Sequence, residues 1–112
     1  MVKYLDDDLG RTFHALADPT RRAMLVRLET EQQLLSVSQL AAQFPMQLNA
    51  VMKHLDVLSD AGLVARSKVG RTVSVELTPQ PMEDAMAWLQ RYERFWTGSL
   101  DKLTALLESD EG

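Results

Sequence analysis

The chain has 112 residues and no cysteine; 46% of its residues are hydrophobic and 25% are charged. Such a composition is typical of one soluble globular domain and excludes a disordered chain. Without cysteine there are no disulfides, thiolate metal ligands or cysteine nucleophiles. There is no apolar run near the roughly 18 residues that cross a bilayer, and the N-terminus has no signal-peptide core. We therefore expect one cytoplasmic, non-membrane domain over residues 1–112, with flexible tails at 1–6 and 109–112.

The net charge of −4 is unevenly distributed along the sequence. Residues 1–72 contain nine Lys and Arg against eight Asp and Glu, whereas residues 73–112 contain three against eight. The acidic excess therefore belongs to the last third, and a local basic surface in the first two thirds is compatible with a nucleic-acid partner.

Apolar spacing and capping residues predict four helices in the first half of the chain, over residues 7–17, 19–29, 36–44 and 47–60. Asp18-Pro19 is a typical helix start. Ser36 and Gln39 match a capping box, and Gly62 suits a left-handed helix end.

The apolar period changes to two after residue 62. Residues 72–77 alternate apolar and polar, which predicts a half-buried strand, and residues 63–68 are its expected partner across a turn at 69–70. A last helix follows over 81–108, about 40 Å long at 1.5 Å per residue. The order of four helices, two strands and one helix predicts a mainly α protein with a β-hairpin wing, which is a winged helix-turn-helix.

The helix at 47–60 has the pattern of a DNA-recognition helix. Its apolar side carries Leu48, Val51, Leu55 and Leu58. The first half of its outer face offers groups that can read bases in a major groove: Gln47, Asn49, Ala50 and Lys53. A merely solvated polar face explains the same periodicity, so the pattern leaves both interpretations open.

The hairpin is basic around its glycine turn, with Arg66, Lys68 and Arg71. This suits a wing that contacts the DNA backbone, although positive charge also protects edge strands from aggregation. Arg21 and Arg22 lie in the first turn of a helix, where positive charge is unfavourable. We expect them to have a partner, either DNA or a carboxylate such as Asp18.

Together these segments resemble the ArsR/SmtB family of winged-helix transcriptional regulators. The similarity is carried by the stretches at 15–22, 40–42, 51–58, 61–64 and 70–71, and it extends over about residues 9–108. It implies a homodimeric cytosolic repressor that binds a palindromic operator and dimerises through its first and last helices.

Departures from the family pattern bear on metals and on the operator. Metal-sensing members have Cys-Val-Cys where this chain has Ser36-Val-Ser38, and a hydroxyl is a poor ligand for thiophilic metals. Because the last helix also lacks histidine, we expect no metal and no cofactor, as in the cysteine-free branch. Relatives often have Ser at Gln47 and Met52 and Lys at Asp56, so the operator sequence is left open. His54, of the family's His-Leu pair, is expected to be half-buried and hydrogen-bonded, with a phosphate contact as the second interpretation.

The last helix carries two apolar stripes, one of which repeats every 3.5 residues. One stripe can pack on the chain's own core, and the other needs a partner. The residues expected at the dimer interface are Phe13, Met86, Leu89, Tyr92, Trp96, Leu100 and Leu103. The aromatic side chains could alternatively line a pocket for a small-molecule effector, whose identity the sequence does not give.

The sequence thus predicts a sequence-specific DNA-binding regulator, a homodimeric repressor of its own or adjacent genes. The alternative is a winged-helix module that binds protein and not DNA. An enzyme is not expected, because the sequence offers no nucleophile–base pair, phosphate-binding glycine loop or metal constellation.

Overall fold

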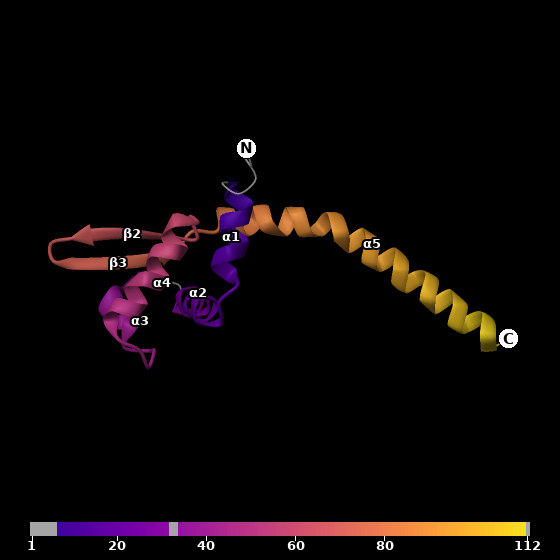
Figure 1. Cartoon of the computed structure of the whole chain (residues 1–112), viewed down its shortest axis with the longest axis horizontal. Helices are drawn as coiled ribbons and strands as arrows, with labels where there is room; N and C mark the ends of the chain where they lie inside the picture. The colour runs from indigo at the N-terminus through magenta and orange to yellow at the C-terminus, as the bar shows by residue number, and fades with distance from the viewer. Residues whose placement is uncertain (1–6, 32–33, 112) are drawn as a thin grey trace.

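The computed structural model describes residues 7–31 and 34–111, with only the backbone for 109–111. The observed elements, in chain order, are α1 (Asp8–Leu16), α2 (Pro19–Glu31), β1 (Leu35–Ser36), α3 (Val37–Ala41), α4 (Leu48–Asp60), β2 (Val64–Val69), β3 (Thr72–Leu77) and α5 (Gln80–Glu111). Figure 1 shows a helical body from which the hairpin projects on one side and α5 on the other. The predicted winged helix-turn-helix fold is confirmed. The tail expected at 1–6 lies outside the described residues, and α5 continues three residues past its predicted end.

The capping box that starts α3 is present as predicted. Gln39 donates its backbone N–H to Ser36 Oγ at 3.0 Å, and Ser36 donates its own to Gln39 Oε1 at 2.9 Å. The helix is nevertheless shorter than expected and ends at Ala41. In the turn that follows, the backbone N–H groups of Gln43 and Phe44 donate to the carbonyls of Leu40 and Ala41. Pro45 follows, and the residue before a proline is disfavoured in a helix.

The sheet has three antiparallel strands in the order β1-β3-β2. The sequence predicted only the hairpin, in which Val64 pairs with Leu77 and Val69 with Thr72. The missed strand β1 pairs Leu35 with Val75. Its two residues are too few for any periodicity, yet they attach the base of the hairpin to the helical body.

One apolar core joins the helices to the sheet. The apolar face of α4 supplies Val51, Leu55 and Leu58, all fully buried, as the sequence predicted. Leu48, predicted on the same face, is instead 54% exposed. Leu48 is the first residue of α4, and the part of the helix that packs on the core begins at Val51. The largest fully buried apolar side chains are Met24, Leu40, Val51, Leu55, Leu58, Leu63 and Val75.

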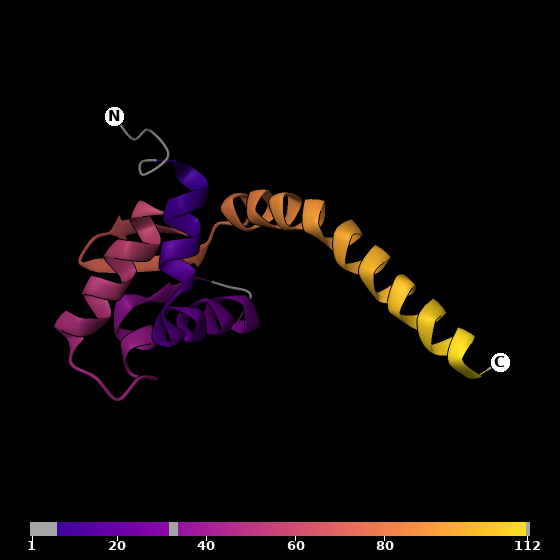
Figure 2. The same ribbon diagram turned by 45° about the vertical axis from the view of Figure 1, so that its right-hand side comes forward.

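The long helix α5 leaves the body of the protein. Its N-terminal part packs on α1, and the remainder extends away from the other elements, so that the molecule measures 71 × 39 × 22 Å (Figure 2). All residues from 86 to 108 are exposed. Most of this helix therefore lies open to solvent in the single chain.

The two leucines of α4 give a matched test of the core. We expect Leu55→Ala to lower the free energy of unfolding by about 2–5 kcal/mol, because it opens a cavity in a fully buried site. Leu48→Ala, at an exposed site on the same helix, should change it by about 0.5 kcal/mol or less. Urea denaturation of both variants measures the difference, and equal losses would contradict this description of the core.

Candidate nucleic-acid interface

The first half of α4 presents polar side chains to solvent. Gln47 is the N-cap residue and makes no side-chain hydrogen bond to the helix, so its amide is available to a ligand. Gln47, Asn49 and Lys53 are exposed, and Ala50 is half-buried between them. Amide and ammonium groups at the start of a helix can read base edges in a major groove, where the helix dipole also favours phosphate.

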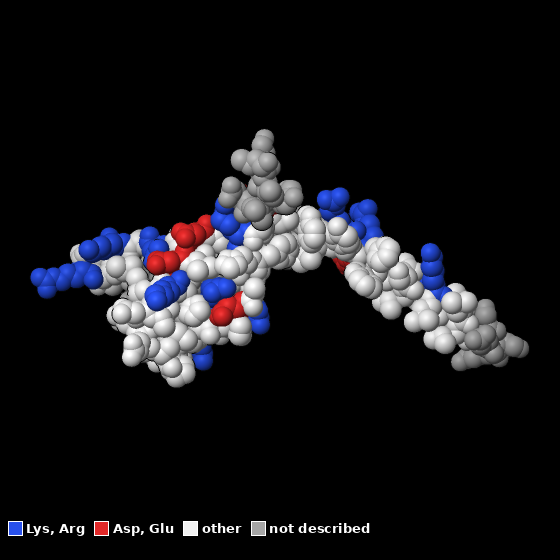
Figure 3. All heavy atoms as spheres, in the orientation of Figure 1, with Lys and Arg blue, Asp and Glu red and all other residues white. Residues whose placement is uncertain are grey.

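The hairpin places further positive charge beside α4. Gly70, at the tip, has φ of 62°, a conformation that glycine adopts without strain. Lys68 and Arg71 flank it, are exposed, and have no carboxylate within 4.0 Å in the part of the chain that the structure describes. Figure 3 shows Lys and Arg side chains gathered along this projection. Both side chains are thus free to contact a phosphate backbone.

Arg66, the third basic residue of the hairpin, is used differently. Its Nη1 lies 2.8 Å from Asp56 Oδ1, so an ion pair joins β2 to α4. The Arg66 side chain is half-buried in this pair. The contact was not expected from the sequence, because two residues ten positions apart on different elements show no periodic relation. The pair fixes the hairpin relative to α4.

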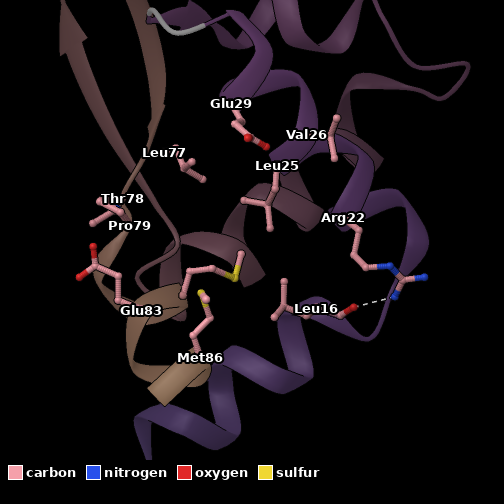
Figure 4. Close-up of a pocket in the computed structure, with 11 residues that line it drawn as sticks. Leu16, Arg22, Leu25, Val26, Glu29, Leu77, Thr78, Pro79, Glu83 and Met86 are labelled. Carbon is pink, nitrogen blue, oxygen red and sulfur yellow. Dashed lines mark hydrogen bonds between the residues drawn. The ribbon is translucent and has the colours of Figure 1, made fainter. Parts of the chain in front are cut away.

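Arg21 and Arg22 bind the end of α1. Arg21 donates from Nε to the Ala15 carbonyl at 2.8 Å and from Nη2 to the His14 carbonyl at 3.1 Å. Arg22 donates from Nη1 to the Leu16 carbonyl at 2.7 Å (Figure 4). The last carbonyls of a helix have no partner within it, so these guanidiniums supply the missing donors. In the described part of the chain these guanidiniums bind backbone carbonyls, and Arg21 also approaches His54. Neither guanidinium forms a hydrogen bond to the carboxylate of Asp18, one of the two expected partners.

His54, on α4, lies close to Arg21 and Asp18, where α1 is followed by α2. Its side chain is 23% exposed, and its Nδ1 lies 3.4 Å from Arg21 Nη1 and 3.9 Å from Asp18 Oδ2. The expected half-buried, hydrogen-bonded histidine is thus observed. The Nδ1 atom of His54 thus lies between a donor, the Arg21 guanidinium, and an acceptor, the Asp18 carboxylate.

Asp18 caps α2 and belongs to this cluster. Its Oδ2 accepts the backbone N–H of Thr20 at 2.9 Å and that of Arg21 at 3.1 Å. The bond from the Arg21 backbone is the main cause that lowers the pKa of Asp18 below its ordinary value of 3.8. Burial opposes this shift, and the bond from Thr20 and the nearby charges of Arg21 and His54 lower the pKa further.

The predicted interface residues are distributed over α1 and α5. Phe13 packs on Trp88 with ring centroids 5.7 Å apart, and Trp88 packs on Tyr92 at 5.0 Å. These aromatic contacts hold α1 against the first half of α5. The other predicted members are all exposed on α5: Met86, Leu89, Trp96, Leu100 and Leu103.

Among the side chains that the structure describes, at residues 7–31 and 34–108, no three His, Asp or Glu gather as a metal site would require. Nor does any helix in this part of the chain have the length and apolar character needed to cross a membrane.

A helix with a polar, exposed first half beside a basic hairpin defines a class of protein, the winged helix-turn-helix transcriptional regulators. A family model described as a helix-turn-helix domain matches residues 16–67. The chain is 36% identical over 100 residues to the HTH-type transcriptional regulator Rv2034 of Mycobacterium tuberculosis, with 89% of each chain covered. It is 23% identical over 84 residues to the transcriptional repressor SdpR of Bacillus subtilis, covering 75% of this chain and 91% of SdpR.

Solved structures agree with these relatives. The crystal structure of the ArsR family transcriptional regulator RHA00566 superposes with a TM-score of 0.74 at 38% identity, covering 87% of this chain and 97% of that one. An ArsR-like transcriptional regulator from Rhodococcus sp. RHA1 gives a TM-score of 0.69 at 30% identity, with 88% and 92% covered. The chain belongs to the ArsR family of transcriptional regulators. It is a DNA-binding transcriptional regulator.

The lowered pKa of Asp18 has a testable consequence for acid stability. A carboxyl that binds its proton less tightly when folded stabilises the fold fully above its unfolded pKa, and this contribution is lost as the pH falls through the folded pKa. We expect the wild type to lose stability below about pH 4 more steeply than Asp18→Asn, which keeps a capping oxygen but cannot titrate. Urea unfolding between pH 7 and pH 2 measures both slopes, and identical slopes would contradict the assignment.

Proposed function

We propose that this protein is a homodimeric repressor that binds a palindromic operator in its own or an adjacent promoter. The exposed first half of α4 carries the proposal: Gln47, Asn49 and Lys53 face solvent while Val51 and Leu55 of the same helix are buried. In this role Gln47, Asn49, Ala50 and Lys53 contact bases, and Lys68 and Arg71 contact the backbone. His54 Nε2 could add a phosphate contact.

Not all of the basic residues serve this role equally. Arg21, Arg22 and Arg66 already have partners within the chain. Each guanidinium has five N–H donors, so these residues can add phosphate contacts, but their first role is to hold α1 and the hairpin in place. Lys68 and Arg71 therefore supply the main electrostatic attraction of the wing.

The exposed α5 stripe supports a dimer. Met86, Leu89, Trp96, Leu100 and Leu103 form an apolar strip that one chain leaves uncovered, and such a strip marks an interface. A two-fold dimer can place two recognition helices about 34 Å apart, one turn of DNA. The repressor role is supported by the similarity to SdpR, a transcriptional repressor.

Selection of bound oligonucleotides from a random pool tests the proposal directly. We expect enrichment of two inverted half-sites whose centres lie one helical turn, about 10 base pairs, apart. A gel shift on the chain's own promoter then tests the regulated gene. If no DNA were retained even at low salt, the protein-binding module would be the better interpretation of the wing.

Arg71→Ala tests the wing. Because a phosphate contact releases counterions whatever the sequence, this change should weaken binding to all duplexes and reduce the slope of log K against log salt by about one. Arg91→Ala, on exposed α5, is the matched control and should leave the slope unchanged. Fluorescence anisotropy at several salt concentrations measures both, and an unchanged slope for Arg71→Ala would remove the wing from the interface.

Asn49→Ala tests base recognition. Losing a bidentate amide–base contact should cost about 1–3 kcal/mol on the selected operator and much less on scrambled DNA, so the specificity ratio falls. Gln90→Ala, an exposed amide on α5, is the control. If both sequences were weakened equally, Asn49 would be a backbone contact and not a base contact.

A further inference from the structure

A polar notch lies between the start of α3 and the part of β3 nearest the tip of the hairpin. Its volume is about 250 Å³, and its lining residues are Ser36, Val37, Ser38, Arg71, Thr72 and Val73. A cavity can hold a water molecule from about 15 Å³ upward, so the notch has ample room for an ion of several atoms. Figure 1 shows α3 beside β3, on the side of the molecule from which the hairpin projects.

The notch exists because β1 is shorter than β3. Ser36 is the last residue of β1 and pairs with Ser74, after which the chain turns into α3. Thr72 and Val73 lie beyond this pairing, and in the described part of the chain they pair with β2 alone. The edge of β3 is therefore open at these two residues, and the first turn of α3 stands across from it.

The charge around the notch is positive. Arg71 lines it, and Lys68 lies opposite Val73 on the neighbouring strand β2. None of the lining residues is acidic. A guanidinium presents several N–H donors in a planar fork that matches the oxygens of a phosphate or carboxylate. The notch is thus suited to an oxyanion.

Two hydroxyl groups in the notch are available to such an anion. Ser36 Oγ already accepts the capping bond from Gln39. Ser38 and Thr72 are exposed, and within the described residues neither hydroxyl makes a hydrogen bond. Each hydroxyl can donate one hydrogen. Together with Arg71, they give the notch donors from both α3 and the hairpin.

The path of a bound duplex indicates which oxyanion occupies the notch. In a helix-turn-helix complex the second helix lies in the major groove and the first crosses the backbone, and these two helices are α4 and α3 here. One strand of the duplex separates the major groove from the neighbouring minor groove. With α4 in the major groove and the hairpin along the backbone, this strand passes between α4 and the tip of the hairpin, where α3 and β3 enclose the notch.

We propose that the notch binds one phosphate of the operator backbone, and that Arg71 and the hydroxyls of Ser38 and Thr72 donate to its oxygens. The inference rests on the proposed function and adds Ser38 and Thr72 to the interface. One phosphate then contacts both the helix-turn-helix and the wing. Since phosphate contacts fix the register of a protein on the duplex, this contact sets where α4 meets the bases.

Ser38→Ala and Thr72→Val remove the two hydroxyls separately. The capping box uses Ser36 and Gln39, so Ser38→Ala leaves it intact, and valine keeps the branched shape of Thr72. Each change should weaken operator binding about threefold to tenfold, because a hydrogen bond to a charged group is lost. The salt slope should not change, because no charge is removed. Ser59→Ala, near the end of α4, is the control and should bind as the wild type does. Fluorescence anisotropy measures the affinities, and circular dichroism checks that the variants are folded.

Methylphosphonate substitution identifies the phosphate itself, because it neutralises one backbone position of the selected operator at a time. We expect one position in each half-site at which neutralisation weakens wild-type binding. The same substitution should cost the variant S38A/T72V at least about threefold less, because part of the contact is already gone. Positions elsewhere in the operator should cost both proteins equally.

The outcomes separate this inference from the proposed function. A wild-type protein that retains no duplex would overturn the function. A protein that binds the operator, but in which no phosphate couples to the two hydroxyls, would overturn the inference and leave the function standing. Nuclear magnetic resonance then tests for a free anion instead. Inorganic phosphate at constant ionic strength would shift the amide resonances of Ser38 and Thr72 without any coupled position in the operator, and this result would also overturn the assignment to DNA.

Discussion

The buried face of α4 is the constraint on which the function of this protein depends. Val51, Leu55 and Leu58 are fully buried, and a helix fixed on three successive turns cannot rotate about its axis without exposing them. Its opposite face is therefore presented to solvent in one orientation. The bond between Asp56 of α4 and Arg66 of β2 also holds the hairpin beside this helix. In the proposed complex, α4 and the hairpin therefore present one connected surface to DNA.

The cluster of Asp18, Arg21 and His54 provides a second connection to α4. Arg21 binds the last carbonyls of α1 and also approaches His54 on α4. Since α1 packs on α5 through Phe13 and Trp88, a continuous set of contacts runs from the long helix to the recognition helix. A displacement of α1 would have to break charge-assisted bonds in this cluster. These contacts connect α1 to α4 through Arg21 and His54.

The elements with a clear period were predictable, and those fixed by single tertiary contacts were not. The helices and the hairpin follow from apolar spacing, capping residues and turn residues in the sequence, and α4 buries the face that its spacing predicts. β1 was missed because two residues show no period, and Leu48 was misplaced because periodicity does not say where the core ends. The role of Arg21 and Arg22 was ambiguous for a similar reason. A guanidinium near a helix start can bind a phosphate or a carbonyl equally well, and only the fold determines which acceptor is near.

In the proposed dimer, the position of the two-fold axis along α5 matters for DNA binding as well as for packing. A change of register by half a heptad moves the axis by 3.5 residues, about 5 Å along the helix. Each domain then shifts by that distance relative to the axis, so the separation of the two recognition helices changes by up to about 10 Å. Successive major grooves on one side of a duplex are about 34 Å apart, and an error of this size would prevent both helices from docking together. The leucines at the end of α5 lie far from the DNA-binding face, yet in the proposed dimer they set the half-site spacing that the protein can read.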